Sequence, residues 1–395
     1  MSRTAGVLLH PTSLPGGTLD HEVIRFLDWM SEAGLGIWQM LPLGAPHGDR
    51  SPYQAISCNA LNPALLPEHN EPIDEAAYQR FVTEQNWWLD DYALFVLLRG
   101  QFNQQSWSTW PEPLRFRERQ ALSAIRDRHH EVLDHLKQEQ YRLFHRWGEV
   151  REAAHQRGIT LFGDVPIAVA YDSADVWAHP ELFKLDAALQ PTVVAGVPPD
   201  YFSETGQRWG NPHYDWQRME QNGFHWWRQR IAQALSKVDL LRIDHFRGLE
   251  ALWEIPADAE TAIDGTWVKT PGRALLEALQ KDFPHMPFVA EDLGVITEEV
   301  VALRDDFDLP GLSVLQFGFD GMEDNPHRLD NQLENSVVYT GTHDNNTTLG
   351  WFNSLEEPLQ QQVISALPAN AGAMPWPLIV AALQSPAQRA VVPMQ

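Results

Sequence analysis

The segment Leu240–Arg247 (LLRIDHFR) decides the fold, because its apolar run ends abruptly in charged residues, as a buried strand of a parallel sheet does. The same design recurs in Phe288–Gly294 (FVAEDLG) and Val337–Asn345 (VVYTGTHDN). In a parallel α/β barrel the C-terminal ends of all strands face one mouth. We therefore expect the polar residues of these three segments to converge there.

Each of the three segments carries one acid at its polar end: Asp244, Glu291 and Asp344. A single acid in that position is more simply explained as the N-cap of a following helix. Three successive examples with basic or imidazole neighbours favour a reactive cluster. Two carboxylates are the minimum for cleaving a glycosidic bond, so the cluster predicts chemistry at the anomeric carbon of a sugar. The neighbouring side chains are Arg242, His245 and His343.

The whole chain, residues 1–395, alternates strand patterns with amphipathic helical patterns. Parallel neighbours need helical crossovers, so this alternation predicts an α/β fold of the (β/α)8 TIM-barrel type. The expected strands are Gly6–His10, Gly36–Leu41, Thr160–Val165, Leu240–Ile243, Phe288–Ala290, Leu312–Gly318, Val337–Thr340 and Ala390–Pro393. The expected helices include Glu22–Ala33, Ser173–Trp177, Trp216–Leu235, Pro271–Lys281 and Thr297–Asp306.

The eighth expected strand is the last element of the sequence, whereas crossover material follows each of the other seven. We therefore expect a barrel truncated after strand 8, with the outer apolar face of that strand exposed to water. Exposed apolar surface costs about 25 cal/mol per Å². On this basis the chain is expected to be a fragment or deletion variant that is unstable or aggregation-prone by itself.

Two long segments are expected to be insertions near the barrel mouth. Residues 64–158 read as a helical insertion between strands 2 and 3, in which His130 and His135 lack the i, i+4 spacing of a helical zinc pair. Residues 187–214 are rich in proline, glycine and aromatic residues, which excludes a regular helix. A connection of that length predicts a substrate-binding lid loop.

Composition narrows the class of partner. The formal net charge of -24 argues against nucleic acids and anionic membranes, because both require basic patches. Cys58 is the single cysteine, which excludes an intrachain disulfide and favours a reducing, cytoplasmic compartment. Neither a signal-peptide pattern nor a long apolar run is visible. No cofactor and no metal are expected.

Further motifs make the chain similar to a known family. They are GVLLHPTSLPG (Gly6–Gly16), WQMLPLG (Trp38–Gly44), SPYQ (Ser51–Gln54), GDVPIAVA (Gly163–Ala170) and FSETGQRWGNP (Phe202–Pro212). From Gly6 to its last residue the chain resembles the 4-α-glucanotransferases, or amylomaltases, of glycoside hydrolase family 77. FSETGQRWGNP and RIDHFRG are highly specific motifs, whereas EDLG alone is weak. The sequence departs from the family in a short turn after Leu14 and in stopping at Val391–Gln395, where family members continue.

The resemblance implies a retaining transferase that moves segments of α-1,4-glucans (maltooligosaccharides, or breakdown products of starch or glycogen) through a covalent glucosyl-enzyme intermediate. It implies that Asp244 is the nucleophile, Glu291 the acid/base and Asp344 the stabiliser of the transition state. It also assigns Asp200, Gln207 and Trp209 to substrate binding.

The residues themselves suggest further roles. Arg242 is two residues before Asp244 on one strand face, so it is expected to favour the ionised carboxylate. Glu291 has no adjacent cation in the sequence, which suits a raised pKa. Tyr53 can offer a stacking platform to a sugar. His245 and His343 can donate to ring hydroxyls. Asp164, at the end of the third strand, either binds a sugar hydroxyl or holds Arg242.

Three alternatives remain at this point. An α-glucan hydrolase on the same barrel would share every catalytic residue, because water and a second glucan can both resolve the intermediate. An inactive glucan-binding fragment would follow if the truncation disables folding. A metal-dependent barrel hydrolase is disfavoured, since it would need several histidine ligands on different strands and His10 stands alone on the first.

Overall fold

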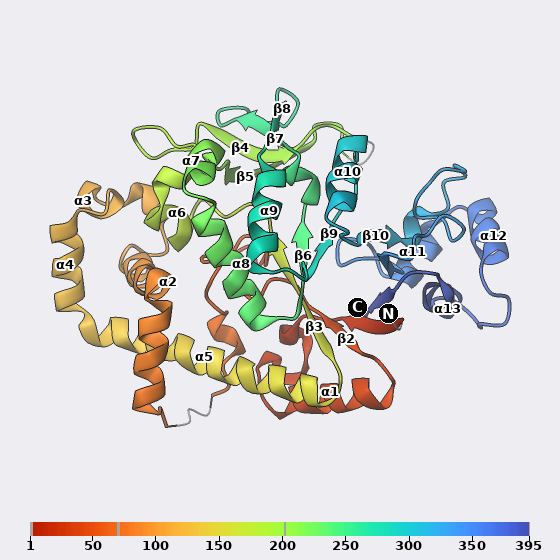
Figure 1. The fold of residues 1–395 in the computed structure, drawn as a ribbon, viewed down its shortest axis with the longest axis horizontal. Coiled ribbons are helices and arrows are strands. Elements are labelled where there is room, and N and C mark those ends of the chain that lie inside the picture. Colours follow the sequence, from red (N-terminus) through yellow and green to blue (C-terminus); the bar gives the residue numbers. More distant parts are fainter. Residues whose placement is uncertain (1–2, 69–71, 201–202, 395) are drawn as a thin grey trace.

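The computed structural model describes residues 3–68, 72–200 and 203–394, and the first residue of the FSETGQRWGNP motif, Phe202, lies outside them. Eight parallel strands form the central sheet in the order β10-β11-β12-β1-β2-β3-β6-β9. Ala290 N–H donates to Pro310 O at 2.8 Å, which bridges β9 and β10 and leaves the barrel nearly closed (Figure 1). The strands are β1 (Thr4–Leu8), β2 (Ile37–Gln39), β3 (Thr160–Pro166), β6 (Leu240–Asp244), β9 (Phe288–Ala290), β10 (Gly311–Val314), β11 (Ser336–Tyr339) and β12 (Arg389–Pro393).

All eight expected strands are present, so the α/β barrel is confirmed. The sixth is shorter than predicted, because Leu315–Phe317 turns into a 3-10 helix after Val314. The helices that accompany the strands are α1 (His21–Glu32), α6 (Ala174–Ala178), α7 (Trp216–Gln221), α8 (His225–Lys237), α9 (Gly272–Asp282), α10 (Glu298–Asp306), α11 (Thr348–Ser354), α12 (Glu357–Ala366) and α13 (Trp376–Gln384).

The single helix expected at Trp216–Leu235 is divided into α7 and α8. Gly223 and Phe224 have left-handed backbone angles, with φ of 66° and 57°. The side chain of Asn222 accepts a hydrogen bond from His225 N–H at 3.1 Å and so provides the oxygen cap from which α8 starts. The hydrophobic spacing that predicts one helix therefore continues across the break between α7 and α8.

Alternate residues of each barrel strand face the interior and the surrounding helices. On β2, Ile37 belongs to the interior cluster, while Trp38 points outward against Phe26 of α1 and Trp147 of α5 (His130–Gln156). Both Ile37 and Trp38 are buried. Burial of one such side chain stabilises the fold by about 1.5–3 kcal/mol. Turning a strand over would lose this free energy, so the burial pattern determines which face of each strand lines the barrel.

Within the segment expected to be a helical insertion, residues 75–156 form four helices. They are α2 (Glu75–Gln101), α3 (Glu112–Arg115), α4 (Arg119–Arg128) and α5, and they occupy the left of Figure 1. The long helices α2 and α5 pack on one another, and α5 also contacts α1, α8 and β3. His130 and His135 lie exposed on α5, so they form part of its solvated face.

The predicted lid loop contains regular structure. Residues 187–214 include β4 (Val193–Val197) and β5 (Gln207–Pro212), which join β7 (Ala251–Pro256) and β8 (Thr266–Lys269) in an antiparallel sheet of order β5-β4-β7-β8. The prolines do not prevent this, because Pro198 follows β4 and Pro212 ends an edge strand. Gly196 is required between them, since a Cβ there would lie 2.0 Å from Gln207 O. The small sheet lies at the top of Figure 1, above the C-terminal ends of β3 and β6.

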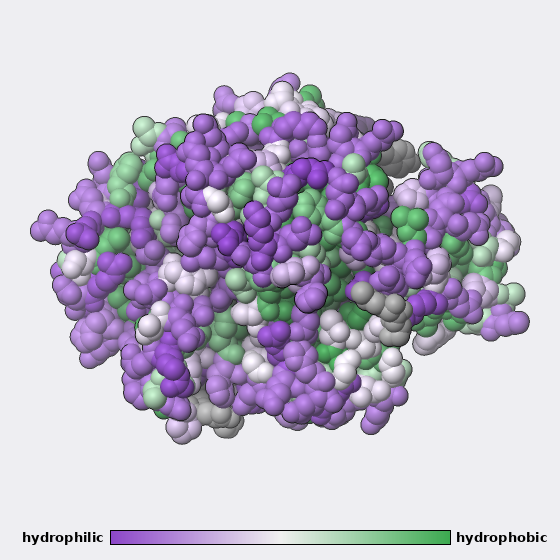
Figure 2. Space-filling model, in the orientation of Figure 1, coloured by the Kyte–Doolittle hydropathy of each residue, from purple (hydrophilic) through white to green (hydrophobic). Residues whose placement is uncertain are grey.

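The expectation that strand 8 exposes its outer apolar face is wrong. Ala390 on β12 is only 3% exposed, and it packs in a cluster with Val338 of β11 and with Leu378 and Ala382 of α13. Helix α13 precedes the strand in the sequence, so a following helix is not needed to cover this face. The face of the molecule in Figure 2 is covered mainly by hydrophilic residues. Within the described ranges, the helices lack the combination of length and apolar content needed to span a bilayer.

Candidate active site

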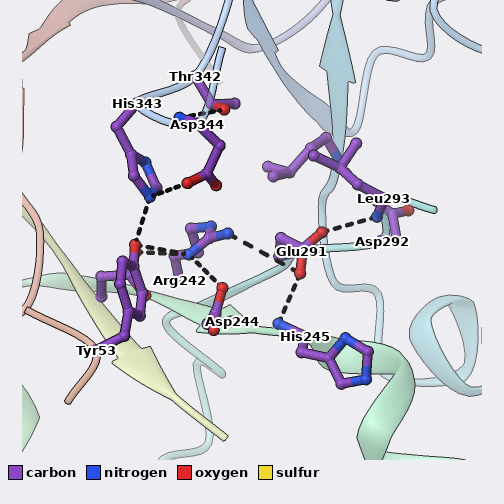
Figure 3. Close-up of polar contacts among 12 residues, drawn as sticks. Tyr53, Arg242, Asp244, His245, Glu291, Asp292, Leu293, Thr342, His343 and Asp344 are labelled. Carbon is purple, nitrogen blue, oxygen red and sulfur yellow. Dashed lines mark hydrogen bonds and ion pairs between the residues drawn. The ribbon is translucent and has the colours of Figure 1, made fainter. Parts of the chain in front are cut away.

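The centre of the site is Arg242, whose guanidinium contacts acids from two strands (Figure 3). Arg242 and Asp244 are two residues apart on β6 and therefore share a face, with Nη1 2.9 Å from Asp244 Oδ1. The register of β3 against β6 places Asp164 beside Arg242, and Nη1 donates to Asp164 Oδ2 at 2.6 Å. The expected contact between Arg242 and Asp244 is confirmed. Asp164 therefore holds Arg242 through Oδ2, and its contact with a sugar hydroxyl stays a prediction.

Glu291 follows β9 and is held by backbone groups as well as by charge. Its Oε2 accepts from His245 N–H at 2.6 Å and its Oε1 from Leu293 N–H at 3.0 Å. Burial raises the pKa of Glu291 to about 7, and Asp244 acts in the same direction while Arg242 opposes it. The raised pKa expected for Glu291 is confirmed, although Arg242, which is distant in the sequence, places Nη2 3.9 Å from Glu291 Oε2. The raised pKa comes mainly from burial.

Tyr53 connects the strand ends to the loop after β11. Its hydroxyl donates to Asp164 Oδ2 at 2.9 Å and also lies 2.9 Å from His343 Nε2. The two rings stack with centroids 5.5 Å apart at 14°. One face of the expected Tyr53 platform is therefore covered by His343. Burial raises the pKa of Tyr53 well above its usual value and lowers the pKa of His343.

Asp344 lies on the loop that follows β11, across from Asp244 and Glu291 in Figure 3. Its side chain is 73% exposed, and Oδ1 lies 3.3 Å from His343 Nε2. Thr342 organises the loop, because its Oγ1 accepts from Asp344 N–H at 3.2 Å and its own N–H donates to Asn345 Oδ1 at 2.8 Å. All three acids therefore surround one space, and Asp344 is the one that solvent reaches most freely.

The lid residues expected to bind substrate differ in how closely they approach the acid cluster. Trp209 on β5 meets the ring of His245 edge to face at 4.9 Å, which connects it to the acid cluster. Gln207 is exposed beside it and accepts from Trp209 Nε1 at 3.1 Å. Asp200 is exposed in the connection after β4, where its Oδ1 accepts from Ser203 N–H at 2.9 Å. These contacts do not bring Asp200 to the acids.

Comparison with known proteins agrees with this geometry. The family model for 4-alpha-glucanotransferases matches residues 8–70 and 67–395. The 4-alpha-glucanotransferase of Thermus thermophilus is 43% identical over 451 aligned positions, which cover 100% of this chain and 90% of that protein. The amylomaltase from Streptococcus agalactiae in complex with acarbose superposes with a TM-score of 0.95 at 32% identity, covering 100% of this chain and 90% of the other. The chain belongs to the 4-α-glucanotransferases of glycoside hydrolase family 77.

Sequence reasoning missed several groups that shape the site of this 4-α-glucanotransferase. Inside the barrel, Tyr339 OH donates to Gln39 Oε1 at 2.8 Å, and both side chains are buried. The only local signal for these two residues is their position on the strands, because each lies two residues from an apolar residue that faces the barrel interior. The backbone N–H groups that donate to the Glu291 carboxylate cannot be recognised from the amino-acid sequence, because any residue carries such a group. His245 has a left-handed φ of 52° that turns its N–H toward Glu291.

His245 itself is placed by burial. Burial lowers the pKa of His245 to about 3, and the nearby Arg247 and Arg242 act in the same direction, so the imidazole is neutral. Its Nε2 is buried and lacks a hydrogen-bond partner among the described residues. A neutral imidazole with one unpaired nitrogen can donate to or accept from a hydroxyl. Among the described residues, the histidine, cysteine and acid side chains form no cluster of three or more that could hold a metal ion.

Proposed function

We propose that this 4-α-glucanotransferase acts by retaining double displacement, with Asp244 as nucleophile and Glu291 as acid/base. The observation that carries the proposal is the contrast between two carboxylates on one guanidinium. Asp244 has a 2.9 Å ion pair with Arg242, which stabilises its charge. Glu291 is more deeply buried, and its pKa is raised to about 7, so it keeps a proton to donate. Carboxyl groups in such contrasting environments are suited to separate roles as nucleophile and acid.

In the first step the Asp244 carboxylate forms a bond to the anomeric carbon while the glycosidic bond breaks. The proton of Glu291 goes to the departing oxygen. In the second step the ionised Glu291 takes the proton from the 4-hydroxyl of another glucan. That oxygen then displaces Asp244, and the new α-1,4 bond restores the original configuration. Both steps use the same two carboxyls, so no group beyond this chain and its glucans is required.

The remaining residues are proposed to stabilise and hold the sugar ring. Asp344 would balance positive charge that develops on the ring, assisted by His343 at 3.3 Å. His245 is proposed to contact a ring hydroxyl once its buried, unpaired Nε2 becomes accessible. Trp209 and Gln207 are proposed to contact the glucan from β5, and Asp200 from the connection before it. The α-1,4-glucan substrate is supported by the amylomaltase from Streptococcus agalactiae, which superposes over the full chain and was solved with acarbose.

Two further expectations stay predictions. The reducing compartment rests on Cys58, a free thiol whose Sγ donates to Asp175 Oδ1 at 2.9 Å. A preference for transfer over hydrolysis depends on water exclusion and acceptor binding at the mouth. Because the Asp344 side chain is exposed, we propose that the β4–β5 hairpin and the bound glucan exclude water from the sugar.

Incubation with maltotriose tests the proposal. A transferase converts maltotriose into a ladder of longer and shorter glucans with little increase in reducing ends. The matched control is Asp244→Asn, which keeps the shape of the site and removes the nucleophile. A rise in reducing ends without longer products would identify the alternative, an α-glucan hydrolase. Maltotriose binding without any turnover by the unmodified chain would identify the other alternative, a glucan-binding protein.

A further inference from the structure

Asp292 directly follows Glu291, but its side chain is directed to the outside of the barrel wall. There Oδ1 accepts from Leu312 N–H of β10 at 2.7 Å, and Oδ2 accepts from Arg304 Nη1 of α10 at 2.5 Å. The Asp292 side chain is 7% exposed and Arg304 13%. One carboxylate therefore connects the end of β9 to the next strand and to the helix that covers it.

This connection lies where the sheet is weakest. The strand order begins at β10 and ends at β9, so these two neighbours share no continuous ladder. Every other neighbouring pair in the barrel is joined by a register of at least three residue pairs. The acid/base candidate therefore sits beside the one seam of the described barrel that lacks a ladder. Besides the Ala290–Pro310 backbone hydrogen bond, Asp292 provides a polar contact across this seam through Leu312 N–H.

The local sequence makes room for this contact. A Cβ on Gly311 would lie 2.4 Å from Asp292 Oδ2 and 2.8 Å from Arg304 Nη1. Any larger residue at the start of β10 would therefore displace the ion pair. Its φ is not in the left-handed region, so the glycine is needed for space rather than for backbone conformation.

The Asp292–Arg304 pair borders a cavity of about 520 Å³, whose lining includes the polar Ser313 and Ser336 as well as the apolar Val301 and Leu312. Ser313 and Ser336 occupy outward positions of β10 and β11, where other strands present apolar residues to helices, and Ser313 Oγ is buried without a partner among the described residues. The position of Asp292 consequently depends on its hydrogen bonds more than on close packing.

We propose that the Asp292–Arg304 pair is a positioning device for Glu291. By fixing Asp292 between β9, β10 and α10, the pair holds the following N–H, that of Leu293, against Glu291 Oε1. The carboxyl is thereby kept in the orientation needed for proton transfer. The proposal rests on the assignment of Glu291 as acid/base, and neither Asp292 nor Arg304 is given contact with the substrate.

A second pair of the same construction provides a control at the other end of the barrel. Asp239 precedes β6, accepts from Leu161 N–H at 2.9 Å, and pairs with Arg151 Nη2 of α5 at 2.9 Å. It therefore joins a strand, its neighbour and a helix as Asp292 does, but at the N-terminal ends of the strands. Loss of this pair should affect stability without affecting proton transfer at the mouth.

The test compares a donor that needs acid assistance with one that does not. Maltotriose has a poor leaving group, whereas α-glucosyl fluoride needs little protonation. We expect Arg304→Met to lower kcat on maltotriose by about 10- to 100-fold, part of the 10²–10⁴-fold that general acid catalysis supplies, while fluoride release falls far less. KM for maltotriose should change little. Arg304→Lys, which retains the charge, should recover most of the loss.

Asp292→Asn is the second variant, because it keeps the shape and the bond from Leu312 and loses only the charge. If Arg304→Met fails to fold, Asp292→Asn tests the positioning proposal by itself. Arg151→Met should lower the Tm and leave the ratio of the two donor rates unchanged. An equal loss on both donors, or no loss, in Arg304→Met and Asp292→Asn would overturn the proposal. Glu291→Gln, measured in parallel, separates failure of the positioning proposal from failure of the acid/base assignment. If it lacks the selective loss on maltotriose, the acid/base assignment itself has failed.

Discussion

The strand ends of β3, β6 and β9 and the loop after β11 contribute acids to the same site under opposite physical conditions. The strand set, which we define as Asp164, Arg242, Asp244 and Glu291, is held by ladder register around a buried guanidinium. Asp344 is 73% exposed on a loop, and its place depends on the hydrogen bond that its N–H donates to Thr342 Oγ1 and on the nearby His343. The comparison indicates that burial and ion pairing set the charges of the strand set, whereas the acid on the loop is open to solvent.

The two regions are coupled through Tyr53. Its hydroxyl reaches Asp164 in the strand set, and both its hydroxyl and its ring face contact His343 on the loop. A buried pair such as Asp164 and Arg242 tolerates loss of one partner poorly, because the remaining charge has no water to solvate it. The strand set should therefore respond to mutation as one unit, whereas the loop should be changed more gradually.

The largest expected effect is at the nucleophile of the strand set. Asp244→Asn should lower kcat on maltotriose by about 10⁴-fold or more, as removal of a nucleophile does in other covalent enzymes. Maltotriose binding, measured by calorimetry, should remain detectable because the shape is kept. If the variant retained more than a small fraction of wild-type turnover, Asp244 would not be the nucleophile. The loop acid gives the matched comparison, since Asp344→Asn should be less damaging.

The second effect concerns the buried acid. Glu291→Gln should lower kcat on maltotriose by about 10²–10⁴-fold, the usual contribution of a positioned proton donor. Glutamine still accepts from one backbone N–H, so the Tm should change little. α-Glucosyl fluoride should partly restore the first step. Near wild-type activity of Glu291→Gln on maltotriose would assign the acid to another residue.

The strand set was readable from sequence because its determinants are local. Apolar runs ending in polar residues give both the strands and the mouth at which Asp244 and Glu291 meet. Contacts between strands are not local, so the approach of Arg242 to Glu291 could not be seen. The β4–β5 hairpin was mistaken for a loop because its strands are short and bordered by proline. The cover over β12 was missed because α13 precedes that strand.

The link that Tyr53 forms between the strand set and the loop can be weakened without changing Asp244 or Asp344. Tyr53→Phe removes the hydroxyl shared by Asp164 and His343 and keeps the stacked ring. Loss of a hydrogen bond to a charged group costs about 1–3 kcal/mol, which corresponds to roughly a 5- to 150-fold fall in kcat. Tyr78→Phe on α2 is the control, because Tyr78 OH contacts Asp134 far from the site. Equal activity of Tyr53→Phe and wild type would show that the two regions act independently.

The last effect is a pH dependence of stability that Glu291 of the strand set produces. The pKa of Glu291 is raised from 4.5 to about 7 by burial in the folded protein. Between these values the folded state keeps a proton that the unfolded state has lost, so Glu291 makes the protein less stable as pH rises through this window. The slope is at most about 1.4 kcal/mol per pH unit, and the opposing effect of Arg242 on the pKa of Glu291 lowers it. In urea unfolding at pH 5, 6 and 7, the wild type should therefore lose stability relative to Glu291→Gln with each step. A stability difference between wild type and Glu291→Gln that stays constant over this range would mean that Glu291 is ionised in the folded protein, and the contrast between the buried strand set and the open loop would then lose its electrostatic basis.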